Sequence, residues 1–171
     1  YAQWIVNNYQ NTTTSRYYET LASALSAVNN GQTIKALTGI TETTAPSLAS
    51  GKTNVTIDLN GKTTRLNGVT LTNAGTLTIT GAGTFTTSSN VDLITNSGTL
   101  TLNHTGTISS TSSNAYHVVK NTGTLNVTGT GTVTSSAKSY TIKGGNINIS
   151  NGLIKSTADS VINTSGNFNM S

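Results

Sequence analysis

Short segments in which apolar residues alternate with Thr, Asn or Asp recur along most of this chain. Alternation of this kind has a period of two residues, which is typical of a β-strand with one buried face. A second apolar position follows each segment after a Gly-containing turn, and a third short apolar run precedes the next segment. The alternating pairs are Ile57/Leu59, Leu77/Ile79, Leu100/Leu102, Leu125/Val127, Ile147/Ile149 and Phe168/Met170, the second positions are Phe85, Ile108, Val133 and Ile154, and the third runs are 91–95, 116–120, 140–143 and 160–163.

These segments belong to an internal repeat. The phrase NAGTLTITGAGTF at 73–85 returns as NSGTLTLNHTGTI at 96–108 and as NTGTLNVTGTGTV at 121–133. A repeat of this length is typical of a solenoid, in which each coil buries its apolar face against its neighbours. Three short strands per repeat predict a parallel β-helix, since the strand-then-helix pattern of leucine-rich repeats is absent. The period is 23, 25, 22 and 21 residues between the equivalent Gly75, Gly98, Gly123, Gly145 and Gly166.

Before the repeats, the segment 20–37 is predicted to hold a short helix, a Gly turn and a first strand. Leu21, Leu25 and Val28 fall on one helical face, and Asn30–Gly31 supplies the stop. With this opening, the chain from about residue 17 to 171 resembles the right-handed parallel β-helices of the pectin-lyase-like superfamily. Its composition, rich in Thr, Asn and Gly and poor in charged residues, resembles that of repeat modules of large microbial cell-surface proteins. The resemblance implies a right-handed parallel β-helix of about 21–25 residues per coil with a capping helix, and it specifies no activity.

We predict three parts: a lead-in segment at 1–16, a capping helix within 17–31, and β-helix coils at 32–171 that are truncated at the C-terminus. QWIV at 3–6 is interpreted as a strand leading in from a preceding module, with Trp4 under the cap, and NNYQNTTTS at 7–15 as a loop. The chain begins without Met and stops inside a repeat, so we expect a fragment of a longer protein. Its export signals and anchors would lie outside this sequence.

Composition and charge narrow the partners. Only 8% of the residues are charged, with nine basic and five acidic side chains and a net charge of +4. Nucleic-acid-binding proteins cluster their basic residues on one face, whereas these are spread from Arg16 to Lys155. We therefore expect no nucleic-acid partner and no membrane within this fragment. The expected location is extracellular, on a cell surface, and the expected partners are glycans or surface proteins and neighbouring modules of the same chain.

Polysaccharide cleavage is the enzymatic alternative for this fold. A lyase needs clustered acids that hold Ca²⁺ beside a basic residue, and a hydrolase needs two facing carboxylates about 5–10 Å apart. Aligned by repeat, the acids do not converge in either way, so we expect no enzyme. The absence of Cys and the spacing of the two His residues also predict neither a metal nor a cofactor. The five acids are Glu19, Glu42, Asp58, Asp92 and Asp159.

The two histidines are interpreted as structural. Asp92 aligns approximately with His117 one coil later, which predicts an exposed Asp–His contact. No Ser or Cys stands out beside that pair as a nucleophile, so we interpret the pair as structural. His104 lies at a corner of its coil and is predicted to be a solvent-exposed polar residue.

Two outward surfaces are candidates for binding. Lys120 and Lys143 align at the ends of third strands and are expected about 5 Å apart, either as two solvated lysines or as an anion site. Tyr116 and Tyr140 in the same strands form a stacked aromatic pair or point inward. The solvent face of the first strand carries a Thr/Asn ladder, which is either structural or, as a minor alternative, an ice-binding array. The ladder residues are Thr76, Thr78, Thr80, Thr99, Thr101, Asn103, Thr124, Asn126, Thr128, Asn146, Asn148 and Ser150.

The sequence thus predicts a non-catalytic β-helix module of a cell-surface protein that acts as a rigid stalk or adhesive segment. The alternative is a carbohydrate-binding or polysaccharide-degrading β-helix whose site lies partly outside this fragment.

Overall fold

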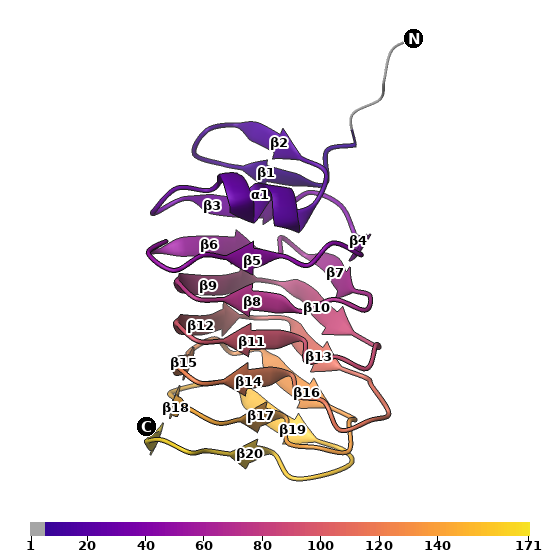
Figure 1. Cartoon of the computed structure of the whole chain (residues 1–171), viewed down its shortest axis with the longest axis vertical. Coiled ribbons are helices and arrows are strands. Elements are labelled where there is room, and N and C mark those ends of the chain that lie inside the picture. Colours follow the sequence, from indigo (N-terminus) through magenta and orange to yellow (C-terminus); the bar gives the residue numbers. More distant parts are fainter. Residues whose placement is uncertain (1–5) are drawn as a thin grey trace.

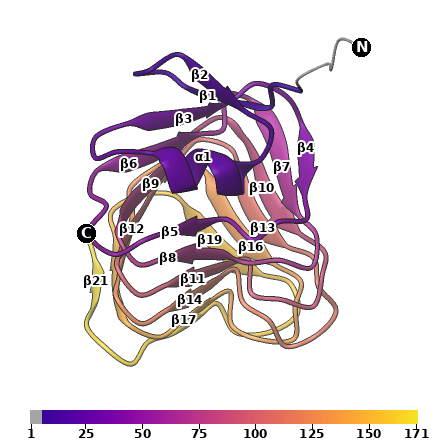
Figure 2. The same cartoon turned by 45° about the horizontal axis from the view of Figure 1, so that its top comes forward.

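A computed structural model describes residues 6–171 of the chain, which form a parallel β-solenoid of about six coils (Figure 1). Each coil contributes one strand to each of three sheets, and one short helix lies at the N-terminal end (Figure 2). This confirms the predicted fold class. The chain runs from the first sheet to the second and then to the third before the next coil begins.

The strands group by sheet as follows. The first sheet holds β1 (Tyr9–Asn11), β2 (Arg16–Tyr18), β3 (Thr33–Ala36), β6 (Val55–Asp58), β9 (Thr76–Gly81), β12 (Thr99–His104), β15 (Thr124–Val127), β18 (Asn146–Ile149) and β21 (Phe168–Met170). The second holds β4 (Ile40–Glu42), β7 (Lys62–Leu66), β10 (Gly83–Thr87), β13 (Thr107–Ser110), β16 (Thr132–Ser135) and β19 (Leu153–Ser156). The third holds β5 (Ser47–Leu48), β8 (Leu71–Asn73), β11 (Ile94–Asn96), β14 (Val119–Asn121), β17 (Ile142–Lys143) and β20 (Ile162–Asn163).

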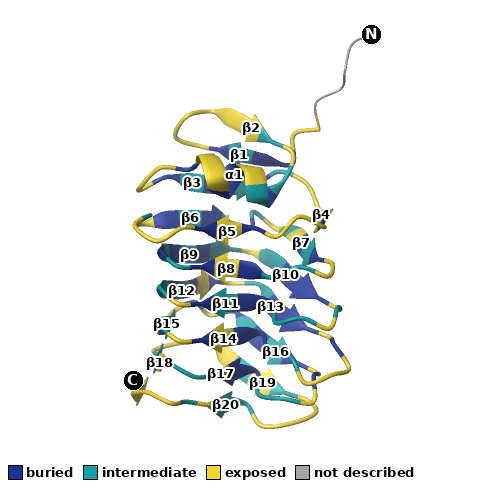
Figure 3. Ribbon diagram, viewed as in Figure 1, coloured by how far each residue is buried: buried dark blue, intermediate teal, exposed yellow. Residues whose placement is uncertain are grey.

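The register stacks equivalent residues of successive repeats directly on one another. In the first sheet Leu77 pairs with Leu100, which pairs with Leu125, and in the second Phe85 pairs with Ile108. These side chains are fully buried, so the core is a continuous column of apolar residues that runs through the coils (Figure 3). The predicted inward positions of the first and second strands are confirmed from β9 to β16.

Strict alternation fails where one sheet turns into the next. Leu93 and Ile94 are consecutive and both fully buried, and so are Val118 and Val119. At a corner the chain changes direction, so two neighbouring side chains can both point into the column. The corners therefore bury more residues than a period of two predicts, including polar ones.

The N-terminal end is covered by α1 (Leu21–Ala27) and by the hairpin β1–β2, which pairs antiparallel with β3. Thr20 caps the helix by accepting a hydrogen bond from the Ser23 amide at 3.1 Å. Leu21 and Leu25 are buried, as predicted. The helix ends at Ala27, with Val28 as C-cap, so Asn30–Gly31 lies in the turn beyond it.

The prediction of a loop at 7–15 was wrong, because part of it forms β1. Tyr9 is fully buried, and its phenol lies 3.4 Å from the Thr64 hydroxyl. Burial raises the pKa of Tyr9, although that hydrogen bond opposes the rise. Pairing with β3 gives β1 backbone partners that a loop would lack. The proposed strand at 3–6 and the packing of Trp4 concern mainly residues outside the described part, and Val6 is exposed.

At the C-terminal end, β19, β20 and β21 are the outermost strands of their sheets. Leu153, Phe168 and Met170 are 52%, 42% and 71% exposed there, in contrast to the buried residues above them (Figure 3). Unpaired strand edges beside exposed apolar side chains favour association.

Candidate functional site

Three polar side chains from successive coils meet where the chain passes from the second sheet to the third. Asp92, His117 and Ser139 lie in the loops before β11, β14 and β17. The His117 Nδ1 atom is 2.8 Å from Asp92 Oδ1, and His117 Nε2 is 2.9 Å from Ser139 Oγ. His117 therefore connects an acid to a hydroxyl, and we name these three residues the Asp–His–Ser array.

The protonation of this array follows from the aspartate. Burial would raise the pKa of Asp92, but hydrogen bonds from the His117 ring and amide, and the positive charges of His117 and Lys120, outweigh burial and lower it. An ionised Asp92 only accepts hydrogen bonds, so a neutral imidazole would carry its single proton on Nδ1. Nε2 is then an acceptor, and the Ser139 hydroxyl donates to it.

The backbone fixes the position of His117. Its amide donates to Asp92 Oδ1 at 2.8 Å, and its carbonyl accepts from the Leu93 amide at 3.0 Å. Asp92 is held in turn, because its carbonyl accepts from the Thr70 hydroxyl at 2.7 Å. The His117 ring is 9% exposed and the Asp92 side chain 16%, so the predicted contact exists but is largely buried rather than exposed.

Ser139 was missed by the sequence analysis, which found no nucleophile beside Asp92 and His117. The loops before β11, β14 and β17 differ in length, so repeat alignment does not bring Ser139 into line with His117. Counted back from the Lys120–Lys143 pair, His117 falls opposite Tyr140, the residue after Ser139. A wider search could have found it. In the coil after a predicted Asp–His pair, a Ser within one residue of the position aligned with the His is the signal to look for.

The predicted ligand-binding residues lie within a few residues of this array along the chain. Lys120 and Lys143 are register partners and both are exposed, as the sequence predicted. Tyr116 and Tyr140 are half-buried, and they precede β14 and β17 rather than lying in them. The register places them one residue out of step. Binding of a ligand by these four residues stays a prediction.

His104 is fully buried, so the prediction that it is solvent-exposed was wrong. It ends β12 opposite Gly81, and a Cβ atom on Gly131 would lie 2.6 Å from the His104 ring, so glycines leave the space that the ring fills. Nε2 lies 3.3 Å from the Thr132 carbonyl, whereas Nδ1 has no partner among the described residues. Burial lowers the pKa of His104, and the bond to Thr132 opposes this only in part.

A ladder of buried asparagines lies at the corner where the third sheet turns into the first. Asn73 Nδ2 donates to Asn96 Oδ1 at 2.7 Å, and Asn96 Nδ2 donates to Asn121 Oδ1 at 2.7 Å. Each side chain also bonds to backbone carbonyls of its own coil and of the next, as Asn96 does to Gly98 at 3.2 Å and to Thr124 at 3.0 Å. We call Asn73, Asn96 and Asn121 the internal Asn ladder.

The predicted Thr/Asn ladder on the outer face of the first sheet is confirmed by its register, in which Thr78 pairs with Thr101 and Thr101 with Asn126. Further along this column, Asn148 Nδ2 donates to Asn126 Oδ1 at 2.9 Å, and Asn169 Nδ2 donates to Asn148 Oδ1 at 2.8 Å. Ice binding by this face stays a prediction.

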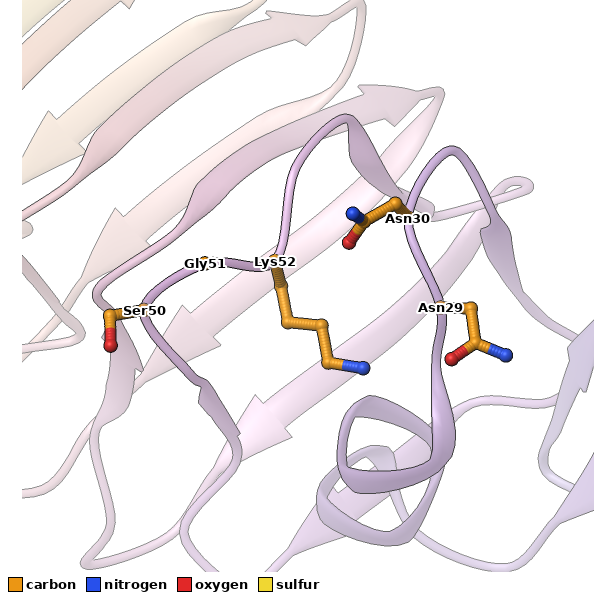
Figure 4. A pocket seen from close by; sticks show the side chains of 5 residues that line it. All are labelled: Asn29, Asn30, Ser50, Gly51 and Lys52. Atoms are coloured by element: carbon orange, nitrogen blue, oxygen red, sulfur yellow. The ribbon is translucent and has the colours of Figure 1, made fainter.

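A shallow hollow of about 530 Å³ lies beside the end of α1 and is lined by Asn29, Asn30, Ser50, Gly51 and Lys52. The Lys52 side chain extends across it (Figure 4). Its ammonium donates to the Val28 carbonyl at 2.7 Å, next to the helix C-terminus, and the Asn30 side chain accepts from the Thr53 amide at 3.1 Å. These groups connect the cap to the first coils.

The class of protein that this fold defines is a three-sheet parallel β-solenoid. Compared with family models, with curated proteins and with solved structures, the chain has no match. Among the described residues, no three His, Asp or Glu side chains gather as a metal site. The seven-residue α1 is too short to cross a membrane, and the described part contains no helix that could.

Proposed function

We propose that this chain is a rigid spacer and display module of a large microbial cell-surface protein. The resemblance to pectin-lyase-like right-handed β-helices and to charge-poor surface repeats supports this role. The observation that carries the proposal is the internal Asn ladder, which ties three consecutive coils together inside the column. Because side-chain amides and backbone strands both bond along the rod, neighbouring coils cannot separate without exposing buried polar groups.

A rod of this kind holds a distal binding segment away from a surface. Its outer faces are rich in Thr and Asn and poor in charge, with 8% charged residues overall. The design uses stacking of coils instead of disulfides, since the chain contains no Cys. The role is mechanical, and it requires only that coil spacing stays fixed in solution.

Spin labels provide a direct test of stiffness, because cysteines can be introduced into a chain that has none. Ser47 and Asn163 are both exposed and lie in one outer column of the third sheet, five strand spacings apart. With about 4.8 Å per spacing, Ser47→Cys and Asn163→Cys place the labelled backbones about 24 Å apart. The matched pair with Lys143→Cys in place of Asn163→Cys is expected to be about 5 Å shorter.

Narrow distance distributions that differ by one spacing would support the rod. Broad distributions, or equal ones for the two pairs, would contradict it. The cell-surface location is tested separately with antibodies against the folded domain on intact cells of the source organism, before and after protease treatment. Labelling confined to permeabilised cells would refute that part of the proposal.

A carbohydrate-binding role is the second candidate, favoured by the side-by-side Lys120 and Lys143 with Tyr116 and Tyr140 beside them. Polar and aromatic side chains on a rigid scaffold are typical of sugar and anion sites. A glycan array with acidic and neutral sugars tests this role. The role would be established if the double variant Lys120→Ala/Lys143→Ala loses binding while Lys62→Ala retains it. If no glycan on the array binds, the spacer role alone remains.

A further inference from the structure

We propose that Ser139 is a nucleophile activated by His117 and oriented through Asp92, and that this corner of the rod hydrolyses small O-acyl esters on an anionic carrier molecule. The proposal goes beyond the spacer role and does not depend on it. It rests on the geometry of the Asp–His–Ser array, which the coil stacking brings together from three separate turns of the chain.

The array has the connectivity that nucleophilic serine chemistry requires. A weak hydroxyl nucleophile needs an adjacent base, and that base needs a third group that fixes its tautomer. His117 Nε2 lies 2.9 Å from Ser139 Oγ, and Asp92 Oδ1 lies 2.8 Å from Nδ1. The same carboxylate oxygen accepts the His117 amide, so the ring and the backbone of the base are both held by Asp92.

Two backbone amides at the nucleophile have no competing partner. The N–H groups of Ser139 and Tyr140 donate no hydrogen bond to any residue between 6 and 171. Amides of the nucleophile and of the residue after it are donors that stabilise the oxyanion of acyl-transfer intermediates in known hydrolases. These two amides are therefore available for the charge that develops on an attacked carbonyl.

The surroundings indicate the class of substrate. Ser139 and Tyr140 are half-buried at an outward corner, and Lys120 and Lys143 are exposed on the neighbouring strands. An open corner accepts an acyl group that projects from a large molecule, and paired lysines attract a carrier with negative charge. A small acyl ester on an anionic carrier fits both conditions.

The reaction balances with water as the second reactant. Ser139 Oγ attacks the ester carbonyl while its proton passes to His117 Nε2. The carbon–oxygen bond to the alcohol breaks, and the leaving oxygen takes that proton from Nε2. Water then attacks the acyl-Ser139 carbonyl and gives its proton to Nε2, after which Ser139 Oγ leaves and recovers the proton. The products are a carboxylic acid and an alcohol, and no redox step occurs.

A fluorophosphonate probe and p-nitrophenyl acetate test the proposal on the whole chain. We expect the probe to label one residue, mapped by mass spectrometry to Ser139, and Ser139→Ala to abolish both labelling and ester hydrolysis. The matched control is Ser136→Ala, which removes an exposed serine of the same loop whose side chain has no hydrogen bond to a described residue. It is expected to react like the parent protein.

Two further measurements separate catalysis from a structural contact. His117→Gln is expected to lower the labelling rate by about 10²–10⁴-fold. Asp92 acts through His117 as a positioning residue, so Asp92→Asn is expected to shift the His117 tautomer seen by ¹⁵N NMR as well as to lower the rate. Labelling no faster than in Ser139→Ala, or rates unchanged in folded His117→Gln, would overturn the proposal.

Discussion

Replacing Asn96 by Ala provides the sharpest test of how the coils are held together. The Asn96 side chain donates to Asn121 Oδ1, to the Thr124 carbonyl and to the Gly98 carbonyl, and it accepts from Asn73 Nδ2. Its amide has two hydrogens for three acceptors, so two of the acceptors share one hydrogen. The two donated hydrogens and the one accepted bond together count as about three hydrogen bonds.

The expected cost follows from those contacts. At about 1 kcal/mol net for each hydrogen bond, their loss removes about 3 kcal/mol. Asn121 Oδ1 accepts from no other described residue, and a buried acceptor without a donor costs about 1–3 kcal/mol more. We therefore expect Asn96→Ala to lower the free energy of unfolding by about 4–6 kcal/mol, measured by urea denaturation followed by circular dichroism.

Asn148→Ala is the matched control because it removes the same chemistry from the surface. Asn148 donates to Asn126 at 2.9 Å and accepts from Asn169 at 2.8 Å, but its partners can bond to water when it is removed. We expect a cost below about 1 kcal/mol. If the two variants lose stability to within about 1 kcal/mol of each other, burial does not set the strength of the internal Asn ladder.

Three further outcomes are expected. Gly98→Ala should lower the free energy of unfolding by about 1–3 kcal/mol or more, because the added Cβ would collide with the Gly75 carbonyl. Gly39→Ala should be tolerated in the same denaturation assay, because its added Cβ would lie 3.7 Å from the nearest atom, the Thr63 carbonyl oxygen. Since burial lowers the pKa of His104, the unfolded chain binds a proton more readily than the folded one. The free energy of unfolding should therefore fall as the pH drops below about 6.5, by up to about 1.4 kcal/mol per pH unit. His104→Gln should flatten this slope, and an unchanged slope would show that His104 is not its cause. Met170→Lys should reduce concentration-dependent association seen by light scattering, and an unaltered association would exclude the exposed edge as its cause.

The repeat made the strands and their register predictable. Equivalent residues recur in every repeat, so aligning the repeats by Gly75 and Gly98 was enough to place Phe85 above Ile108, and aligning the ends of the third apolar runs placed Lys120 beside Lys143. Period-two alternation then identified which residues point inward along each strand. Both signals are local, and stacking of identical coils converts them directly into tertiary contacts.

The corners were not predictable in the same way. Alternation gives no rule for a residue where the chain bends, so His104 and the internal Asn ladder were not recognised as buried, although they fill the space beside glycines and turning backbone. Loop lengths between equivalent strands also vary, which hid Ser139 from alignment with His117. The N-terminal hairpin lies outside the repeat, so the repeat pattern could not predict the pairing of β1 with β2 and with β3 that distinguishes it from a loop.

The stacking register has a consequence for how such a molecule can change its length. The strands of each middle coil pair in nearly the same way with the coil before and with the coil after. Leu100, for example, is flanked by Leu77 and Leu125 in one unbroken column. A duplicated stretch of one period would therefore meet complementary neighbours on both sides, with its asparagine joining the internal Asn ladder. Copying genetic segments would extend the rod in increments of about 4.8 Å, so its reach could be adjusted by copy number while each new coil–coil interface stays equivalent to the one it replaces.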